Sequence, residues 1–225
     1  IRQRQTRSLR VAVHRDRPGI TIDETWDALG MRATGSHDVV FDNVPIEDGD
    51  FTSRRSLEKN REVMSSGGAW FPLLIGAANL GISEAARDYA VNYVRTRNPG
   101  GQAALATIPY VREQIGRVDS KLIAARTLLL TTADDWEHHP QARTQLEPQV
   151  AAAKVLATNT AIEVVEAAMR LVGGVALQRS EPLERYFRDV RSGIVNPPIE
   201  ARALDQIARA ALDGPEPGSL DPRLD

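Results

Sequence analysis

The side chains in this sequence that could bind a metal gather at one place, where Asp134, Asp135 and Glu137 precede His138 and His139. Carboxylate oxygens and imidazole nitrogens are common ligands of divalent metal ions. A built metal site also needs hydrogen-bonding partners that orient its ligands. These five residues instead lie at the polar end of an expected helix, which is typical of a hydrated surface. We therefore expect no metal.

A further pair of carboxylates, Glu163 and Glu166, is spaced like half of a di-iron motif. A di-iron bundle needs a Glu-x-x-His pair from each of two helices. The sequence has four histidines and no such pair, so we reject a di-iron site. It also has no cysteine, which excludes disulfides, zinc ribbons, iron–sulfur clusters and a thiol nucleophile.

Glycine pairs occur three times, as Gly67-Gly68, Gly100-Gly101 and Gly173-Gly174. Such a pair can cradle a phosphate, but a pair that follows a helix more often ends that helix. None of the three belongs to a G-x-G-x-x-G, Walker, G-x-S-x-G or H-E-x-x-H motif. The residue types alone therefore name no reaction.

The composition is that of an ordinary globular protein. Of the 225 residues, 42% are hydrophobic and 26% are charged, which suits one large domain or two small ones. The net charge of −2 argues against nucleic acid as a partner, so we interpret the basic start IRQRQTRSLR as a solvated end. No apolar run is long enough for a membrane span, and the lack of cysteine fits a cytoplasmic protein. Because the chain begins with Ile1 and shows no signal peptide, we expect it to be a fragment.

The first fifty residues have the two-residue period of β-strands. Leu9, Val11 and Val13 alternate with other residues, and further short strands are expected at 20–22 and 39–41. Three short strands do not make an independently stable sheet. We predict a partial β-domain over residues 1–50 and a linker over residues 51–69.

From Trp70 onward the period becomes helical. We expect one helix to Arg97, a second with an apolar stripe, a third from Pro148 to Gly173-Gly174, and a fourth after Pro197-Pro198. The stripe of the second helix has spacings of four and three: Val111, Ile115, Val118, Leu122, Ala125 and Leu129. Small residues in the first helix, including Gly76 and Ala86, predict close packing against a neighbour.

The sequence thus predicts a mainly α fold, with part of a small β-domain before a C-terminal four-helix bundle. We expect the bundle to span residues 70–212. A loose tail is expected at residues 213–225 because that segment is rich in proline, glycine and aspartate.

The segment from Pro18 to Val44 resembles the second half of the β-domain of the acyl-CoA dehydrogenase superfamily. That family has a W-x-x-x-G-x-R-x-T/S-x-S loop before a V-x-F-x-x-V strand. The matching residues here are Trp26, Gly30, Arg32, Thr34, Ser36, Val39, Phe41 and Val44. The match is specific because it combines the spacing with a strand alternation and an intervening loop.

The helical half resembles the same family in the same order. Three consecutive helices of its C-terminal domain are similar to ISEAARDYAVNYVRTR, VREQIGRVDSKLIAARTLLL and AAAKVLATNTAIEVVEAAMRLVGGVAL. Its R-D segment and the loop over the flavin ring are similar to RYFRDVRSGIVNPP. The resemblance spans residues 10–212, and it implies that the family's N-terminal helical domain and the first half of its β-domain would precede Ile1.

The resemblance implies an oxidoreductase that binds FAD between the β-domain and the bundle, and a homodimer or homotetramer assembled through the bundle. It places Arg97 at the FAD diphosphate, and Gly173 and Gly174 where backbone approaches the adenine portion. A guanidinium pairs bidentately with phosphate, and glycine leaves room for such an approach. The family reaction is α,β-desaturation of an acyl-CoA thioester, with hydride transfer to the flavin.

This sequence departs from the family around the cofactor. Pro99 and Gly100 stand where the family has a Thr-Phe pair that packs on FAD. Arg170 stands where the family has a glutamine before the paired glycines.

It also departs from the family at the catalytic base. The usual glutamate position holds Pro197 and the alternative position holds Phe71, and neither side chain accepts a proton. Glu200 lies three residues beyond the loop, where we expect it to cap a helix rather than act as a base. The catalytic residues are therefore left unassigned.

Two alternatives stay open. A two-component flavin-dependent monooxygenase acting on a small organic substrate needs no such base, because reduced flavin itself reacts with oxygen. The ending R-D-V-R-x-G-x-x-N-P-P, from Arg188 to Pro198, resembles the branch with such enzymes, although no histidine follows His139. The other alternative is a catalytically silent bundle subunit.

Overall fold

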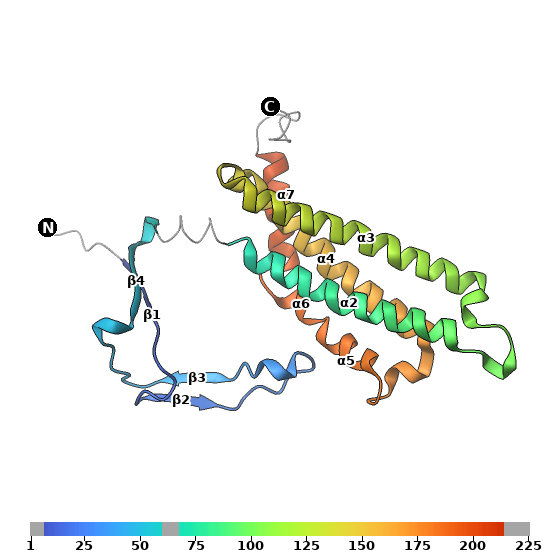
Figure 1. Cartoon of the computed structure of the whole chain (residues 1–225). Coiled ribbons are helices and arrows are strands. Elements are labelled where there is room, and N and C mark those ends of the chain that lie inside the picture. Colours follow the sequence, from blue (N-terminus) through green and yellow to red (C-terminus); the bar gives the residue numbers. More distant parts are fainter. Residues whose placement is uncertain (1–6, 60–67, 214–225) are drawn as a thin grey trace. The chain divides into compact units, whose positions relative to one another are not determined.

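The computed structural model describes residues 7–59 and 68–213 (Figure 1). The chain divides into two compact units at Gly68 and Ala69, and each is described by itself. We call residues 7–59 the β unit and residues 69–213 the helical unit. Four sequence expectations lie partly or wholly outside the described residues: the basic start at 1–6, Gly67, the linker beyond residue 59 and the tail from 214.

The β unit contains two antiparallel strand pairs. Strand β1 (Arg7–Val11) pairs with β4 (Phe51–Ser56), with Leu9 opposite Arg54. Strand β2 (Ile20–Asp23) pairs with β3 (Asp38–Phe41), with Ile22 opposite Val39. The three strands expected from the sequence are confirmed, within two residues at their ends.

The expectation that residues 51–56 belong to a linker is wrong. These residues, FTSRRS, form strand β4. Their sequence lacks the apolar alternation that marks a half-buried strand, and the strand exists because its backbone hydrogen-bonds to β1. The neighbouring turn is held by Arg17, whose guanidinium binds the Asp50 carboxylate through two hydrogen bonds and donates to the Pro45 carbonyl at 2.9 Å.

The helical unit is a four-helix bundle, as predicted. Its long helices are α2 (Trp70–Thr96), α3 (Pro109–His138), α4 (Arg143–Val172) and α7 (Glu200–Leu212). Two short helices, α5 (Pro182–Asp189) and α6 (Ser192–Val195), connect α4 to α7 (Figure 1). None of the described helices is long and apolar enough to cross a membrane.

Helix α4 begins earlier than the sequence indicates. The expected start was Pro148, because proline is favoured at the first helical position. The helix begins at Arg143, and Pro148 lies inside it in the second turn. Helices α5 and α6 were not predicted, because helices of eight and four residues are too short to show a periodic apolar pattern.

Side-chain contacts between helices show the direction in which each helix runs. Arg87 on α2 donates to both carboxylate oxygens of Asp119 on α3, each at 2.7 Å, and Arg126 on α3 reaches Glu84 on α2 at 2.8 Å. Helices α2 and α3 therefore run antiparallel, because the later residue of one meets the earlier residue of the other. Helix α4 runs antiparallel to α3, because Lys121 binds Glu163 whereas the later Thr132 accepts from the earlier Gln149. Helices α2 and α4 therefore run parallel.

Small residues let α2 approach its neighbours closely. A methyl group added at Gly76 would lie 3.0 Å from the Leu129 side chain and 3.3 Å from that of Ala157. Further along, Ala86 and Ala90 pack into one cluster with Ala161 and Val165 of α4. The apolar stripe expected on α3 is buried at five positions, Val111, Val118, Leu122, Ala125 and Leu129, and Ile115 is half-buried.

Candidate functional site

Arg97 is the first residue after α2, and its backbone is fixed at both ends. Its N–H donates to the Tyr93 carbonyl at 2.9 Å, and its carbonyl accepts from the Leu105 N–H at 3.1 Å. The side chain is exposed, and within residues 7–59 and 68–213 its guanidinium has no ion-pair partner. Arg97 is thus an exposed cation, unpaired among the described residues, whose backbone is hydrogen-bonded on both sides.

Gly173 and Gly174 follow the last residue of α4, and the two glycines differ. Gly173 has φ 73° and ψ −147°, a conformation that essentially only glycine adopts. Gly174 has no positive φ, and a methyl group added there would meet no described atom within 4 Å. The fold therefore explains glycine at 173, whereas at 174 it leaves open space beside the backbone.

The helix directions bring these residues to one end of the bundle. Helices α2 and α4 run parallel, so Arg97 and the glycine pair both lie at the end where those helices finish (Figure 1). A groove of about 330 Å³ between α3 and α4 opens near this end and includes Tyr110, Gln114 and Arg170. Arg97 and the glycine pair, which lie far apart in the sequence, therefore share one end of the bundle.

The charges along this groove are largely paired. Lys121 binds Glu163, and Arg117 binds Glu113 at 2.6 Å. Glu166 accepts a hydrogen bond from Arg191 at 2.9 Å. Arg170 has no ion pair within the described part of the chain, so it adds positive charge to the same end as Arg97.

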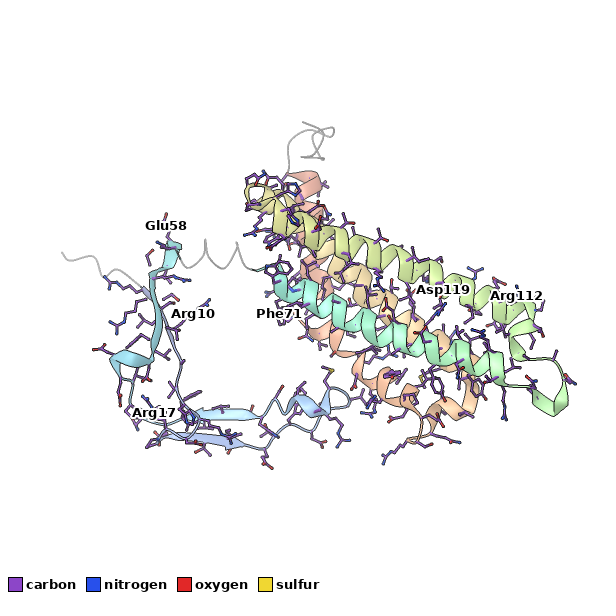
Figure 2. The ribbon with its side chains drawn as sticks, viewed as in Figure 1. Arg10, Arg17, Glu58, Phe71, Arg112 and Asp119 are labelled. Atoms are coloured by element: carbon purple, nitrogen blue, oxygen red, sulfur yellow. The ribbon has the colours of Figure 1, made fainter. Side chains whose placement is uncertain are left out.

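The positions where the family has its base carry no proton acceptor. Pro197 follows α6 and is exposed, and Phe71 lies in the first turn of α2 with its ring half exposed (Figure 2). Glu200 is the first residue of α7, and its carboxylate accepts a hydrogen bond from the Asn159 amide at 2.9 Å. The expectation that Glu200 caps this helix is wrong, because the N-cap of α7 is Ile199 and no side-chain hydrogen bond caps this end within the described residues. A carboxylate in the first turn still suits the positive end of the helix.

Polar contacts hold α5 and the residue before it. Arg188 pairs with Glu184 one turn earlier in α5, at 2.8 Å, and this hydrogen bond lowers the pKa of Glu184. The Tyr89 hydroxyl of α2 hydrogen-bonds to Glu181, just before α5, at 2.5 Å. That bond raises the pKa of the Tyr89 phenol to about 12.

Sequence reasoning missed one buried charge, Lys154. Its side chain is 1% exposed in the middle of α4, and its ammonium donates to the Gly193 carbonyl of α6 at 2.8 Å. Burial lowers the pKa of Lys154, and the nearby charge of Glu200 opposes that shift. The sequence signal was a lysine within the otherwise apolar run AAAKVLA.

The candidate metal ligands are not gathered into a site. In residues 7–59 and 68–213, no three His, Asp or Glu side chains lie close enough together to hold an ion. Asp134 contacts His138 at 3.1 Å, and Asp135 approaches His139 at 3.9 Å. Asp135 is buried, so the expected hydrated surface is wrong at that position. Glu163 and Glu166 are each engaged by a cation, as described above.

Comparison with known proteins identifies the helical unit. Residues 73–195 match the family described as "Acyl-CoA dehydrogenase, C-terminal domain". A Bacillus subtilis protein named "Putative acyl-CoA dehydrogenase YdbM" is 38% identical over 202 residues, which cover 89% of this chain and 51% of that protein. The L-evernosamine nitrososynthase of a Micromonospora species is 34% identical over 209 residues, which cover 89% of this chain and 48% of the enzyme.

A solved structure extends the comparison to the fold. The dibenzothiophene monooxygenase TdsC of Paenibacillus matches with a TM-score of 0.78 at 27% identity, covering 92% of this chain and 56% of that one. TdsC with FMN bound matches with the same TM-score at 26% identity. The chain thus spans about half the length of the relatives it matches.

Proposed function

Because this chain belongs to the acyl-CoA dehydrogenase family, we propose that it forms part of a flavin-dependent oxidoreductase. Relatives at 38% and 34% identity carry dehydrogenase and nitrososynthase names, and a structural neighbour binds FMN. What these names share is redox chemistry on one scaffold. They support the class of enzyme more strongly than any one substrate.

The observation that carries this proposal is that Arg97, Gly173 and Gly174 lie at the same end of the bundle. Arg97 offers an exposed guanidinium without an internal partner, which suits a phosphate. Gly174 leaves backbone accessible where the fold itself does not require glycine. Arg97 would hold the diphosphate of FAD, and Gly173 and Gly174 would let backbone approach its adenine portion. The flavin supplies the hydride acceptor or the oxygen-reactive centre.

We propose FAD as the flavin. FAD extends beyond its first phosphate to a second phosphate and an adenosine, and the groove beside Arg170 lies at the same end as Arg97. FMN, which is bound in the TdsC structure, ends at its single phosphate. Identification of the released cofactor by mass spectrometry distinguishes the two.

Among substrates, we propose the CH–CH bond of an acyl-CoA thioester. The support is the 38% identity to a protein named as an acyl-CoA dehydrogenase. In such a reaction the α-proton must go to a base, and neither Pro197 nor Phe71 provides one. A base elsewhere in the complete protein would have to accept that proton.

The missing base favours a second candidate, a flavin-dependent monooxygenase acting on a small organic substrate. In that chemistry reduced flavin reacts with oxygen, and no α-proton has to be removed from a thioester. The names of the nitrososynthase and dibenzothiophene monooxygenase relatives are in keeping with it. The specific observation is proline at position 197.

The experiment uses the complete protein supplied with FAD or FMN. Bleaching of the flavin absorbance by an acyl-CoA without oxygen supports the dehydrogenase. Oxygen-dependent formation of an oxygenated product with supplied reduced flavin supports the monooxygenase. If neither bleaching nor an oxygenated product is seen, both candidates are contradicted and a silent bundle subunit is supported.

Arg97 gives the sharper test of the cofactor site. Arg97→Ala should weaken flavin binding about tenfold or more, because a charged hydrogen-bonding group to phosphate is lost. Arg95→Ala is the matched control, since Arg95 is exposed in the last turn of the same helix and has no assigned role. Equal flavin affinity in the two variants would contradict the assignment of Arg97.

We also propose a homodimer or homotetramer assembled through the bundle. Apolar side chains are exposed on two of its helices, including Leu74 on α2 and Ile123 and Leu130 on α3. Contiguous exposed apolar surface commonly marks an interface. Light scattering of the complete protein measures the assembly, and Ile123→Glu should reduce it. A cytoplasmic location stays a prediction.

A further inference from the structure

The loop between β2 and β3 is held together by hydrogen bonds to one backbone carbonyl. We call residues 24–37 the β2–β3 loop. Its Met31 carbonyl accepts from the Trp26 indole N–H at 3.2 Å, from the Thr34 hydroxyl at 2.8 Å and from the Thr34 backbone N–H at 3.1 Å. The Ser36 hydroxyl donates to the Thr34 hydroxyl at 3.1 Å. Polar contacts within the loop therefore order it, although most of its residues are exposed.

The β2–β3 loop contains a strained residue. Met31 has φ 54°, in the left-handed region that residues other than glycine seldom adopt. Such a conformation persists only where the surrounding contacts hold it. The loop has little buried apolar surface to supply those contacts, since Leu29 is 67% exposed and Trp26 is 37% exposed. Its conformation therefore depends on a small number of hydrogen bonds.

One further hydrogen bond joins the two ends of the loop, and it requires a neutral histidine. The backbone N–H of Trp26 donates to Nδ1 of His37 at 3.1 Å. A backbone N–H only donates, so Nδ1 has to be the acceptor, and only neutral imidazole has an acceptor nitrogen. The proton of the His37 ring is therefore assigned to Nε2. When the ring gains a second proton, two N–H groups face each other and this hydrogen bond is lost.

The charged groups near His37 do not replace this hydrogen bond. Asp23 and Asp38 lie opposite each other where β2 ends and β3 begins. The loop itself adds three charged side chains, those of Glu24, Asp27 and Arg32. Among the described residues, none of these five forms an ion pair with His37. No described carboxylate is thus placed to hold a protonated ring where the neutral ring lies.

We propose that His37 is a pH-sensitive switch, which holds the two ends of the β2–β3 loop together when it is neutral and releases them when it is protonated. Imidazole is the side chain that changes its charge between about pH 8 and 5. Release separates Trp26 from His37, whereas the backbone pairing of β2 with β3 does not use the imidazole and stays. The inference concerns the β unit alone and does not depend on the proposed flavin chemistry.

Hydrogen–deuterium exchange on the complete protein tests the switch, with each rate corrected for the intrinsic effect of pH. The protection of the Trp26 amide should fall about tenfold from about pH 8 to about pH 5, because its acceptor is lost. The amides of β3 and α4 should keep their protection over the same range. Unchanged protection at Trp26 overturns the proposal. An equal loss at β3 and α4 also overturns it, because such a loss is not local.

The variant His37→Asn separates the effect of the hydrogen bond from that of the proton. The asparagine Oδ1 occupies the position of the imidazole Nδ1 and accepts a backbone N–H at any pH. The Trp26 amide should therefore stay protected at about pH 5 in this variant. His37→Leu has no acceptor and should leave that amide unprotected at both pH values. A pH-dependent loss that persists in His37→Asn overturns the proposal, because another group then causes it.

The variant His14→Asn is the matched control. His14 also accepts a backbone N–H at Nδ1, that of Asp16 at 3.4 Å, but it precedes β2 and lies outside the loop. The loss of protection at Trp26 should be unchanged in this variant, and its disappearance would overturn the assignment to His37. If the two His37 variants do not fold, the pH series on the unsubstituted protein and on His14→Asn decides the proposal.

Discussion

The two units of this protein differ in where they put their apolar side chains. The helical unit encloses many of its own in two buried clusters, and Leu183 and Val190 are fully buried. The β unit leaves them outside, and Phe41 of β3 is 65% exposed. The helical unit therefore has a core that stabilises it from within, whereas the β unit depends on strand pairing and on the Arg17–Asp50 contact.

The largest expected difference is between the unfolding behaviour of the two units when each is studied alone. Residues 69–225 alone should keep their helical circular dichroism and unfold cooperatively, because the apolar clusters lie within that unit. Residues 1–68 alone should show no cooperative unfolding transition. A cooperative transition in the β unit alone would contradict this expectation and show that its exposed strands are stable without further packing.

Shortening one apolar side chain in each unit should give the next largest difference, here in the free energy of unfolding. Leu183→Ala should lower the free energy of unfolding by about 2–5 kcal/mol, because a fully buried side chain leaves a cavity. Phe41→Ala should change it by less than about 0.5 kcal/mol in the 225-residue chain, because that ring is already exposed. Urea unfolding measures both, and similar losses would contradict the contrast between the units.

Substitution of the two paired glycines should affect different properties, stability for Gly173 and flavin binding for Gly174. Gly173→Ala should cost about 1–3 kcal/mol of stability, because its backbone conformation strains any other residue. Gly174→Ala should leave stability within about 0.5 kcal/mol and weaken flavin binding by the complete protein. Thermal unfolding and flavin titration separate the two effects, and unchanged flavin affinity in Gly174→Ala would remove that residue from the proposed site.

The smallest expected change in stability concerns the hydrogen bond between Tyr89 of α2 and Glu181, just before α5. Since the folded-state pKa of Tyr89 is raised from 10.0 to about 12, the stability from its hydrogen bond to Glu181 is fully present below pH 10.0. It is lost as the pH rises towards about 12, because the phenolate then repels the carboxylate. Tyr89→Phe should reduce this alkaline loss, by less than about 1 kcal/mol because the pair is partly solvated. Melting curves across this pH range for the two proteins measure the difference.

The sequence predicts best the elements whose side chains repeat with a clear period. The stripe from Val111 to Leu129 predicts α3, and the alternation around Val39 predicts β3. Strand β4 is missed because its pairing uses backbone atoms, which no side-chain pattern reports. Helix α6 is missed because its position depends on contacts with other helices.

For the candidate site too, the sequence predicts which residues matter but not how the fold places them. The resemblance singled out Arg97 and Gly173-Gly174, and only the helix directions show that they share one end of the bundle. Lys154 gave a weak signal, since one lysine among alanines does not reveal which carbonyl it will reach. Contacts between residues distant in the chain are set by packing, and a single sequence does not display them.

The parallel course of α2 and α4 has an electrostatic consequence for the end that carries Arg97. Two helices finish there and one, α3, begins, so their macrodipoles sum to a net negative potential at that end. An anionic group bound there gains nothing from the helices and depends on guanidinium charge exposed to solvent. Binding of a phosphate at this end should therefore weaken steeply as ionic strength rises.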